Sequence, residues 1–169
     1  MSRFRLSILF VTFLAGVSLC FAQTTKNKRR RAAAPAKHIV VTPDQIKWSP
    51  APPSVPAGAE MAVLSGDPSR AGLPFTIRFK MPDGYKVAPH WHPTNENVNV
   101  IQGTLMIGMG TKFVESAGSE LPTGSYALMP KGVRHFAWTK GETIIDVYGT
   151  GPFAITYINP SDDPRRKAK

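Results

Sequence analysis

Cysteine is almost missing from this sequence of 169 residues, whose single example is Cys20. Cys20 lies in an N-terminal segment that we expect to be removed, so the mature chain would contain no cysteine. That absence excludes disulfide bonds, thiolate metal ligands and a cysteine nucleophile. Acidic residues are also few, 11 against 21 lysines and arginines, and the formal net charge is +10. An exported chain without disulfides has to be stabilised by its core, with or without the help of a metal ion.

The first 22 residues have the layout of a cleavable secretory signal. Arg3 and Arg5 supply a positive start, residues 6–19 are almost entirely apolar, and small residues precede a cleavage point after Ala22. The apolar run is shorter than the stretch of about 20 residues that spans a membrane. We therefore expect residues 1–22 to be a signal peptide. The mature protein would then be secreted or periplasmic, with no membrane anchor left after cleavage.

Much of the positive charge lies at the two ends of the mature chain. Residues 23–37 are rich in Lys, Arg, Thr, Ala and Pro, and charged residues also follow Pro160. Basic runs can contact nucleic acid, anionic lipid or acidic polysaccharide, but most are solvated tails. No nucleic-acid-binding motif accompanies these runs. We interpret residues 23–37 as a flexible leader and residues 161–169 as a charged tail, and we expect no nucleic-acid partner.

Between these ends the sequence has the pattern of short strands separated by many of its 16 prolines and 14 glycines. Residues 75–81 alternate apolar and polar side chains, as a half-buried strand does. Four prolines make residues 49–59 an extended loop. The pattern predicts one all-β domain, a sandwich or barrel, over residues 38–160. Its expected strands are 38–41, 61–65, 75–81, 98–101, 104–109, 126–129, 143–148 and 153–158, with a hairpin-like step at Gln102–Gly103.

Three of the four histidines occur in two short segments. The first segment reads Gly84-x5-His90-x-His92-x3-Glu96-x6-Gly103. Residues two apart on a strand project from the same face, about 7 Å apart at the backbone, so the rings of His90 and His92 can converge on one ion. Residues between His92 and Glu96 form a turn signal, which would bring Glu96 back on an adjacent strand, near the same face.

The second segment reads Gly124-x5-Pro130-x-Gly132-x2-His135. Pro130 and Gly132 are typical of a tight turn. That turn would place His135 at the start of the following strand, where it supplies a third imidazole.

The two segments closely resemble the two sequence motifs of the cupin family. The resemblance covers about residues 75–160 and implies a small, secreted, single-domain cupin. The second motif departs from the family at its end, where Thr139 stands in place of a common Asn, at a position that is usually structural. The resemblance implies a cupin jelly-roll β-barrel. It also implies one divalent metal ion, with the ligands His90, His92, Glu96 and His135.

Ligand chemistry leaves the identity of the metal open. Imidazole suits Zn, Cu, Fe and Ni, and a carboxylate admits Mn. By resemblance to cupin dioxygenases, the leading interpretation is a metal-dependent oxygenase or other oxidoreductase, with a small oxygenated organic substrate and with Glu96 as the catalytic proton acceptor. The alternatives are a non-oxidative isomerase, lyase or decarboxylase, and a non-catalytic module that binds metal or a small ligand. A barrel with exposed sheet edges also predicts a homodimer.

Other polar and aromatic residues are weaker candidates for the site. The four tyrosines could supply an acid or base but are typically packing residues, and Phe136 and Trp138 could line either the pocket or the core. Lys131 and Arg134 could hold an anionic substrate, although a solvated loop charge is the more common role. Three amides could orient the imidazoles: Asn97, Asn99 and Gln102.

Overall fold

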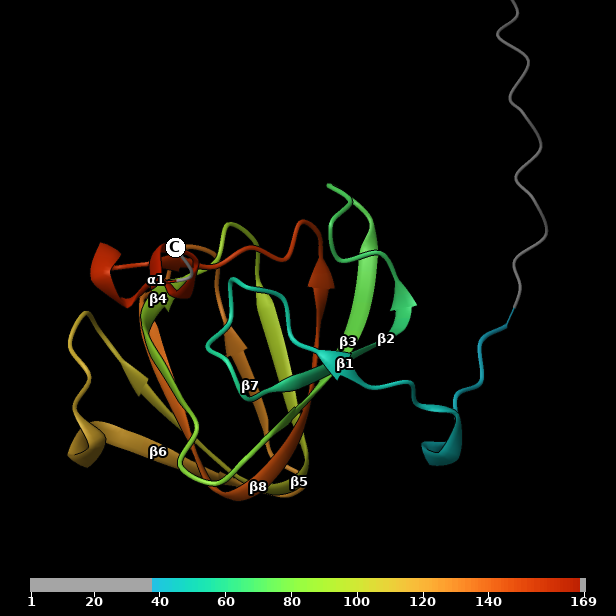
Figure 1. Ribbon diagram of the computed structural model, residues 1–169, viewed down its shortest axis with the longest axis horizontal. Helices are drawn as coiled ribbons and strands as arrows, with labels where there is room; N and C mark the ends of the chain where they lie inside the picture. The colour runs from blue at the N-terminus through green and yellow to red at the C-terminus, as the bar shows by residue number, and fades with distance from the viewer. Residues whose placement is uncertain (1–37, 168–169) are drawn as a thin grey trace, which may run out of the picture. The chain divides into compact units, whose positions relative to one another are not determined.

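The computed structural model describes residues 38–167, which form one compact unit (Figure 1). The expected signal peptide, residues 1–22, and the basic leader, residues 23–37, lie outside the described residues, as do residues 168–169 at the end of the charged tail. Within residues 38–167, no helix has the length and apolar character needed to cross a membrane.

The described chain is almost entirely β structure. Besides its strands it contains three short 3-10 turns and one turn of α-helix, η1 (Pro43–Gln45), η2 (Glu115–Ala117), η3 (Pro160–Asp162) and α1 (Pro164–Lys167). The strands are β1 (Ser49–Pro50), β2 (Glu60–Gly66), β3 (Pro74–Met81), β4 (Lys86–Trp91), β5 (Glu96–Met109), β6 (Gly118–Pro122), β7 (Tyr126–Met129), β8 (His135–Thr150) and β9 (Thr156–Tyr157).

All nine strands belong to one antiparallel sheet that curls into a jelly-roll barrel, as expected (Figure 1). The strand order is β1-β2-β3-β8-β4-β9, and β5 lies along the other edge of β8 with β6 and β7 on its own far edge. The long strand β8 holds the barrel together. Its first half pairs with β4 and its second half with β3, while β5 pairs with it from end to end.

The prediction of a hairpin-like step at Gln102–Gly103 is wrong, because β5 runs continuously through these residues. The register between β5 and β8 shifts on both sides of Gln102. Gly103 has φ +77° and Gly141 in β8 has φ +74°, a backbone region that favours glycine. Paired bulges of this kind bend two strands together, so the sheet turns a corner here without a chain reversal.

The strand expected at residues 38–41 is also wrong. Ile39, Val40 and Val41 are 61%, 72% and 41% exposed, and they pair with no strand of the described chain. Their β-branched side chains favour a strand, but a strand also needs a partner. His38 is therefore an exposed residue of an irregular segment rather than a strand-edge residue.

Side-chain alternation along the bent strands divides the apolar residues into two groups. The barrel interior holds the main core, which includes Ile77, Val100 and Val147. Phe136 and Trp138 project from the opposite face of β8 and pack with Phe113 in a smaller cluster outside the barrel. These two aromatic residues therefore belong to a core and not to the pocket.

The proline-rich segment expected as an extended loop over residues 49–59 begins with β1 at Ser49–Pro50, and its remainder, residues 51–59, is a loop with turns that closes over the core. Val55 is 8% exposed and packs into the barrel interior. Two tyrosine hydroxyls hold the backbone on either side of Val55: Tyr85 donates to the carbonyl of Pro56, and Tyr157 donates to the carbonyl of Ser54 at 2.9 Å. Burial raises the pKa of Tyr157 to about 12, which keeps this hydroxyl protonated as a donor.

Replacing Tyr157 by Phe should loosen segment 51–57 without disrupting the barrel. The change leaves the carbonyl of Ser54 without its donor, so the free energy of unfolding should fall by about 1 kcal/mol, and amide hydrogen exchange around Val55 should accelerate. Tyr126→Phe is the matched control, because the Tyr126 hydroxyl bonds to Asn97 on an exposed face. Equal exchange rates at residues 51–57 in both variants and the wild type would contradict the assigned role.

Candidate metal centre

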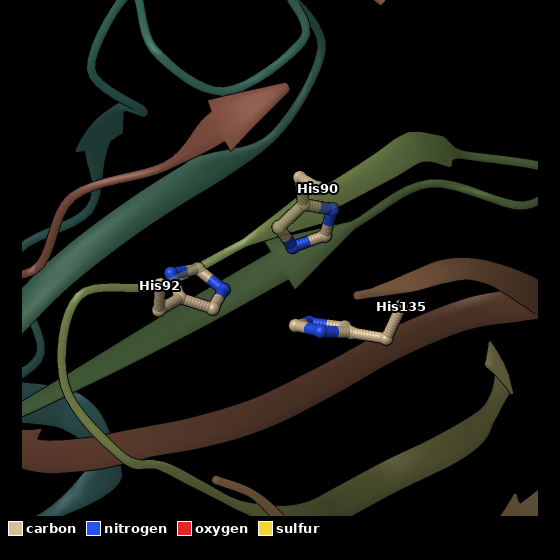
Figure 2. Close-up of side chains that lie close together, drawn as sticks. All are labelled: His90, His92 and His135. Atoms are coloured by element: carbon tan, nitrogen blue, oxygen red, sulfur yellow. The ribbon is translucent and has the colours of Figure 1, made fainter. Parts of the chain in front are cut away.

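The three motif histidines come together at one end of the barrel interior (Figure 2). His90 is on β4, His92 lies just past the end of that strand, and His135 is the first residue of β8, as the turn at Pro130–Gly132 predicts. His90 and His135 face each other in the register of β4 and β8. All three side chains are buried, with exposures of 4%, 3% and 2% in sequence order.

Backbone hydrogen bonds join the two motif segments. The amide of Gly132 donates to the carbonyl of His92 at 2.9 Å, and the amide of Lys131 donates to the Asn95 side chain at 2.9 Å. Gly132 has φ +78°, which places it in the left-handed region that a tight turn requires. The turn before His135 is therefore tied directly to the turn after His92, so the two segments are positioned as one unit.

Glu96 reaches the histidines by a different route from the one expected. We predicted that it would return on a strand adjacent to β4, but β5 pairs with β6, β7 and β8, and it has no pairing with β4 in residues 38–167. Glu96 is the first residue of β5, and the curl of the sheet brings it beside the rings. Its Oε2 lies 3.4 Å from Nε2 of His92 and 3.3 Å from Nε2 of His135.

Main-chain carbonyls orient all three rings. Nδ1 of His90 lies 2.8 Å from the carbonyl of Ala88, and Nδ1 of His135 lies 3.1 Å from the carbonyl of Val133. Nδ1 of His92 lies 2.8 Å from the carbonyl of Ala154. A carbonyl can only accept, so each Nδ1 is the donor of its contact, and a neutral ring in this position keeps its lone pair on Nε2. This is the arrangement in which metal-binding histidines are usually held.

The donor atoms fit a bound metal ion. The ligand atoms of the three histidines lie within 4.8 Å of one another, and Nε2 of His92 is buried without a hydrogen-bond partner. Two ligands bound at about 2.1 Å to one ion lie roughly 3.0–3.4 Å apart in tetrahedral or octahedral geometry, and Glu96 is at that distance from two of the rings. A buried polar atom without a partner lowers the stability of the fold, and a bound ion would be a partner for this nitrogen. The three histidines could therefore bind a metal ion.

Burial and charge set the protonation states of these groups. Burial lowers the pKa of His90 to about 3, so this ring is neutral at physiological pH. For Glu96, burial acts to raise the pKa, but the imidazoles of His92 and His135 outweigh burial and hold the pKa well below its usual range. For His92, burial acts to lower the pKa, but the negative charge of Glu96 outweighs burial and the pKa ends above its ordinary value. Glu96 is therefore an ionised, anionic donor.

The weaker candidates do not join the donor set. Asn97 donates to the carbonyl of Tyr148 and accepts from the Tyr126 hydroxyl, and the rings are oriented by carbonyls instead of amides. Lys131 and Arg134 are exposed. Thr139, at the position where the motif departs from the family, is 2% exposed, and its hydroxyl links the Tyr85 amide to the Pro82 carbonyl, a structural role.

Sequence reasoning missed the contribution of Ala154, whose carbonyl orients His92. Ala154 lies in an irregular stretch between β8 and β9, at 62 residues from His92. Its contribution is a main-chain atom, so its residue type carries no signal. The available sequence signal is that Ala154 stands between two apolar residues, Phe153 and Ile155, which in the structure pack against the core.

Solved structures with low sequence identity share this fold. The polyketide cyclase RemF from Streptomyces resistomycificus is 16% identical, with a TM-score of 0.60 over 77% of this chain and 92% of that chain. A proposed acetylacetone dioxygenase from Methylibium petroleiphilum is 21% identical, with a TM-score of 0.59 over 78% and 88%. KdgF from a Halomonas species is 17% identical, with a TM-score of 0.50 over 69% and 94%.

At sequence level, no curated protein matches the chain significantly. One protein family does match, described as the ChrR cupin-like domain, over residues 36–154. This range contains both motifs, all four expected ligands and every strand from β1 to β8. The jelly-roll topology and the buried histidine cluster agree with that match, and the chain belongs to the ChrR cupin-like family.

Proposed function

We propose that this protein is a metal-dependent oxygenase that acts on a small oxygenated organic molecule. The observation that carries the proposal is the convergence of His90, His92, His135 and Glu96 at the wall of an apolar pocket in the barrel. Donors of this type suit Fe, Mn, Ni, Cu or Zn. A bound ion of this kind supplies Lewis acidity and, when it is redox-active, one-electron chemistry with O₂.

The protein's own groups would hold the ion and a substrate in fixed positions. The three carbonyls fix the orientation of the rings, and the cavity walls offer almost only apolar surface to a bound substrate. Glu96 is the only carboxylate among the residues that line the cavity. It is therefore the group placed to accept a proton from a bound substrate. The fold neighbour described as a proposed acetylacetone dioxygenase supports this reaction class by analogy.

Replacing His92 by Ala should lower metal content at least about tenfold, because the change removes a buried nitrogen that no other partner satisfies. The measurement is elemental analysis by mass spectrometry, on protein purified without a His-tag. His38→Ala is the matched control, since His38 is exposed and outside the cluster. Full metal occupancy in the His92 variant would rule out the assigned site.

Oxygen uptake separates the oxygenase from its alternatives. With Fe, Mn, Cu or Ni bound, we expect substrate-dependent oxygen consumption at an oxygen electrode, using a panel of small diketones, diols and hydroxy acids. With Zn bound we expect none, because Zn is redox-silent. Substrate conversion without oxygen uptake would instead show an isomerase, lyase or decarboxylase. If no substrate of the panel is converted with any ion, the remaining hypothesis is a module that binds metal or ligand without catalysis.

Export through the N-terminal signal is a further part of the proposal. Arg3, Arg5 and the apolar residues 6–19 support it, together with the small residues before the end of the segment at Ala22. Expressed with this segment in a bacterial host, the mature protein should begin at Gln23 and appear in the periplasm or medium. N-terminal sequencing checks this, and a cytoplasmic product that begins at residue 1 or 2 would refute it.

A further inference from the structure

The cavity beside the histidines is almost entirely apolar. It has a volume of about 70 Å³ and is lined by aliphatic, methionine and aromatic side chains, among them Phe79, Met81, Ile107, Val147, Phe153 and Ile155. Its polar lining consists of the four donors and Tyr85, whose hydroxyl already donates to the carbonyl of Pro56. Among the described residues that line it there is no Lys, Arg, Asp, Asn, Gln, Ser or Thr.

Charge balance limits what this cavity can hold. A divalent ion binds imidazole in its neutral form. Three neutral rings, the Glu96 carboxylate and the ion would together carry one net positive charge. One anionic group on a ligand would neutralise that charge. A second anionic group against the wall would have no cationic partner, because no Lys or Arg of the described chain lines the cavity and the two candidates named from the sequence, Lys131 and Arg134, are exposed.

Hydrogen-bonding capacity limits the ligand in the same way. Against the cavity wall, a hydroxyl away from the ion would meet only carbon atoms or the already bonded Tyr85 side chain. Burying a polar group without a partner weakens binding. Sugars and sugar acids carry several such groups, whereas methyl and methylene groups would gain from contact with this wall.

We propose that the cavity takes a compact, apolar molecule with a single acidic oxygen group, of which the enol of a 1,3-dicarbonyl compound is an example, and that it rejects dianions and polyhydroxylated compounds. The inference rests on the proposed metal site. It goes further by naming the chemical class of ligand, and it applies equally to an oxygenase, a non-oxidative enzyme and a binding module.

A matched pair of ligands tests the inference by binding alone. 2,4-Pentanedione and malonate both offer two oxygens across a three-carbon unit, but malonate carries a second negative charge and lacks the methyl groups. Zinc-loaded protein is used because zinc allows binding without oxidation. Isothermal titration calorimetry gives each dissociation constant, and titrations of free Zn²⁺ in the same buffer give the intrinsic preference of the ion. We expect the protein to shift the affinity ratio towards 2,4-pentanedione by about tenfold or more relative to free Zn²⁺.

A lysine placed on the cavity wall should change this selectivity. Val55 lines the cavity, whereas Val63 on β2 is 49% exposed and outside it. Val55→Lys should move the affinity ratio towards malonate by about tenfold, and Val63→Lys should leave the ratio unchanged. Thermal unfolding and zinc content of both variants show whether each is folded and loaded. The wild-type comparison stands by itself where Val55→Lys fails to fold.

Zinc content measured on the same samples separates the two proposals. Wild-type protein without zinc would overturn the metal site, and this inference with it. If zinc is stoichiometric, any of three results would overturn the inference alone. These are a preference for malonate, an affinity ratio equal to that of free Zn²⁺, and no binding of either ligand.

Discussion

The antiparallel pairing of β5 with β8 determines which side chains of these two strands face the barrel interior, and so it positions the metal site. The two strands remain in register from Met109 opposite His135 to Glu96 opposite Gly149, apart from the bulges at the corner. This pairing directs alternate side chains of both strands into the barrel. Glu96 and His135 therefore both face inward from the first residues of their strands, and the curl of the sheet brings these two starting points together.

A charged cluster inside an apolar barrel is stable only when its charges are balanced. The Glu96 carboxylate lies among neighbouring imidazoles, and its depressed pKa records how strongly they favour the ionised form. Nε2 of His92 nevertheless remains without a hydrogen-bond partner. The described chain thus satisfies every ring at Nδ1 and leaves the opposite nitrogens directed at one another, which is an arrangement that a cation completes.

The residue types of the site could be predicted from the sequence, because metal donors are side chains and their spacing along strands has a simple geometric meaning. The turn signal at Pro130–Gly132 correctly placed His135 at the start of β8. Strand pairing was harder to predict. The position of β5 away from β4 depends on contacts between residues distant in sequence, and β-branched residues at 38–41 favour a strand that has no partner in the described chain. The continuous bend at Gly103 has the same local signal as a turn, since both require a positive φ.

The orientation of the three histidines by main-chain carbonyls has a consequence for how such a domain can diverge. The carbonyls of Ala88, Val133 and Ala154 are present whatever side chains those positions carry. The apolar residues on the cavity wall make none of these bonds with their side chains. Mutations there can reshape the ligand space while the donor geometry persists, so one scaffold can acquire new specificities without rebuilding its metal-binding apparatus.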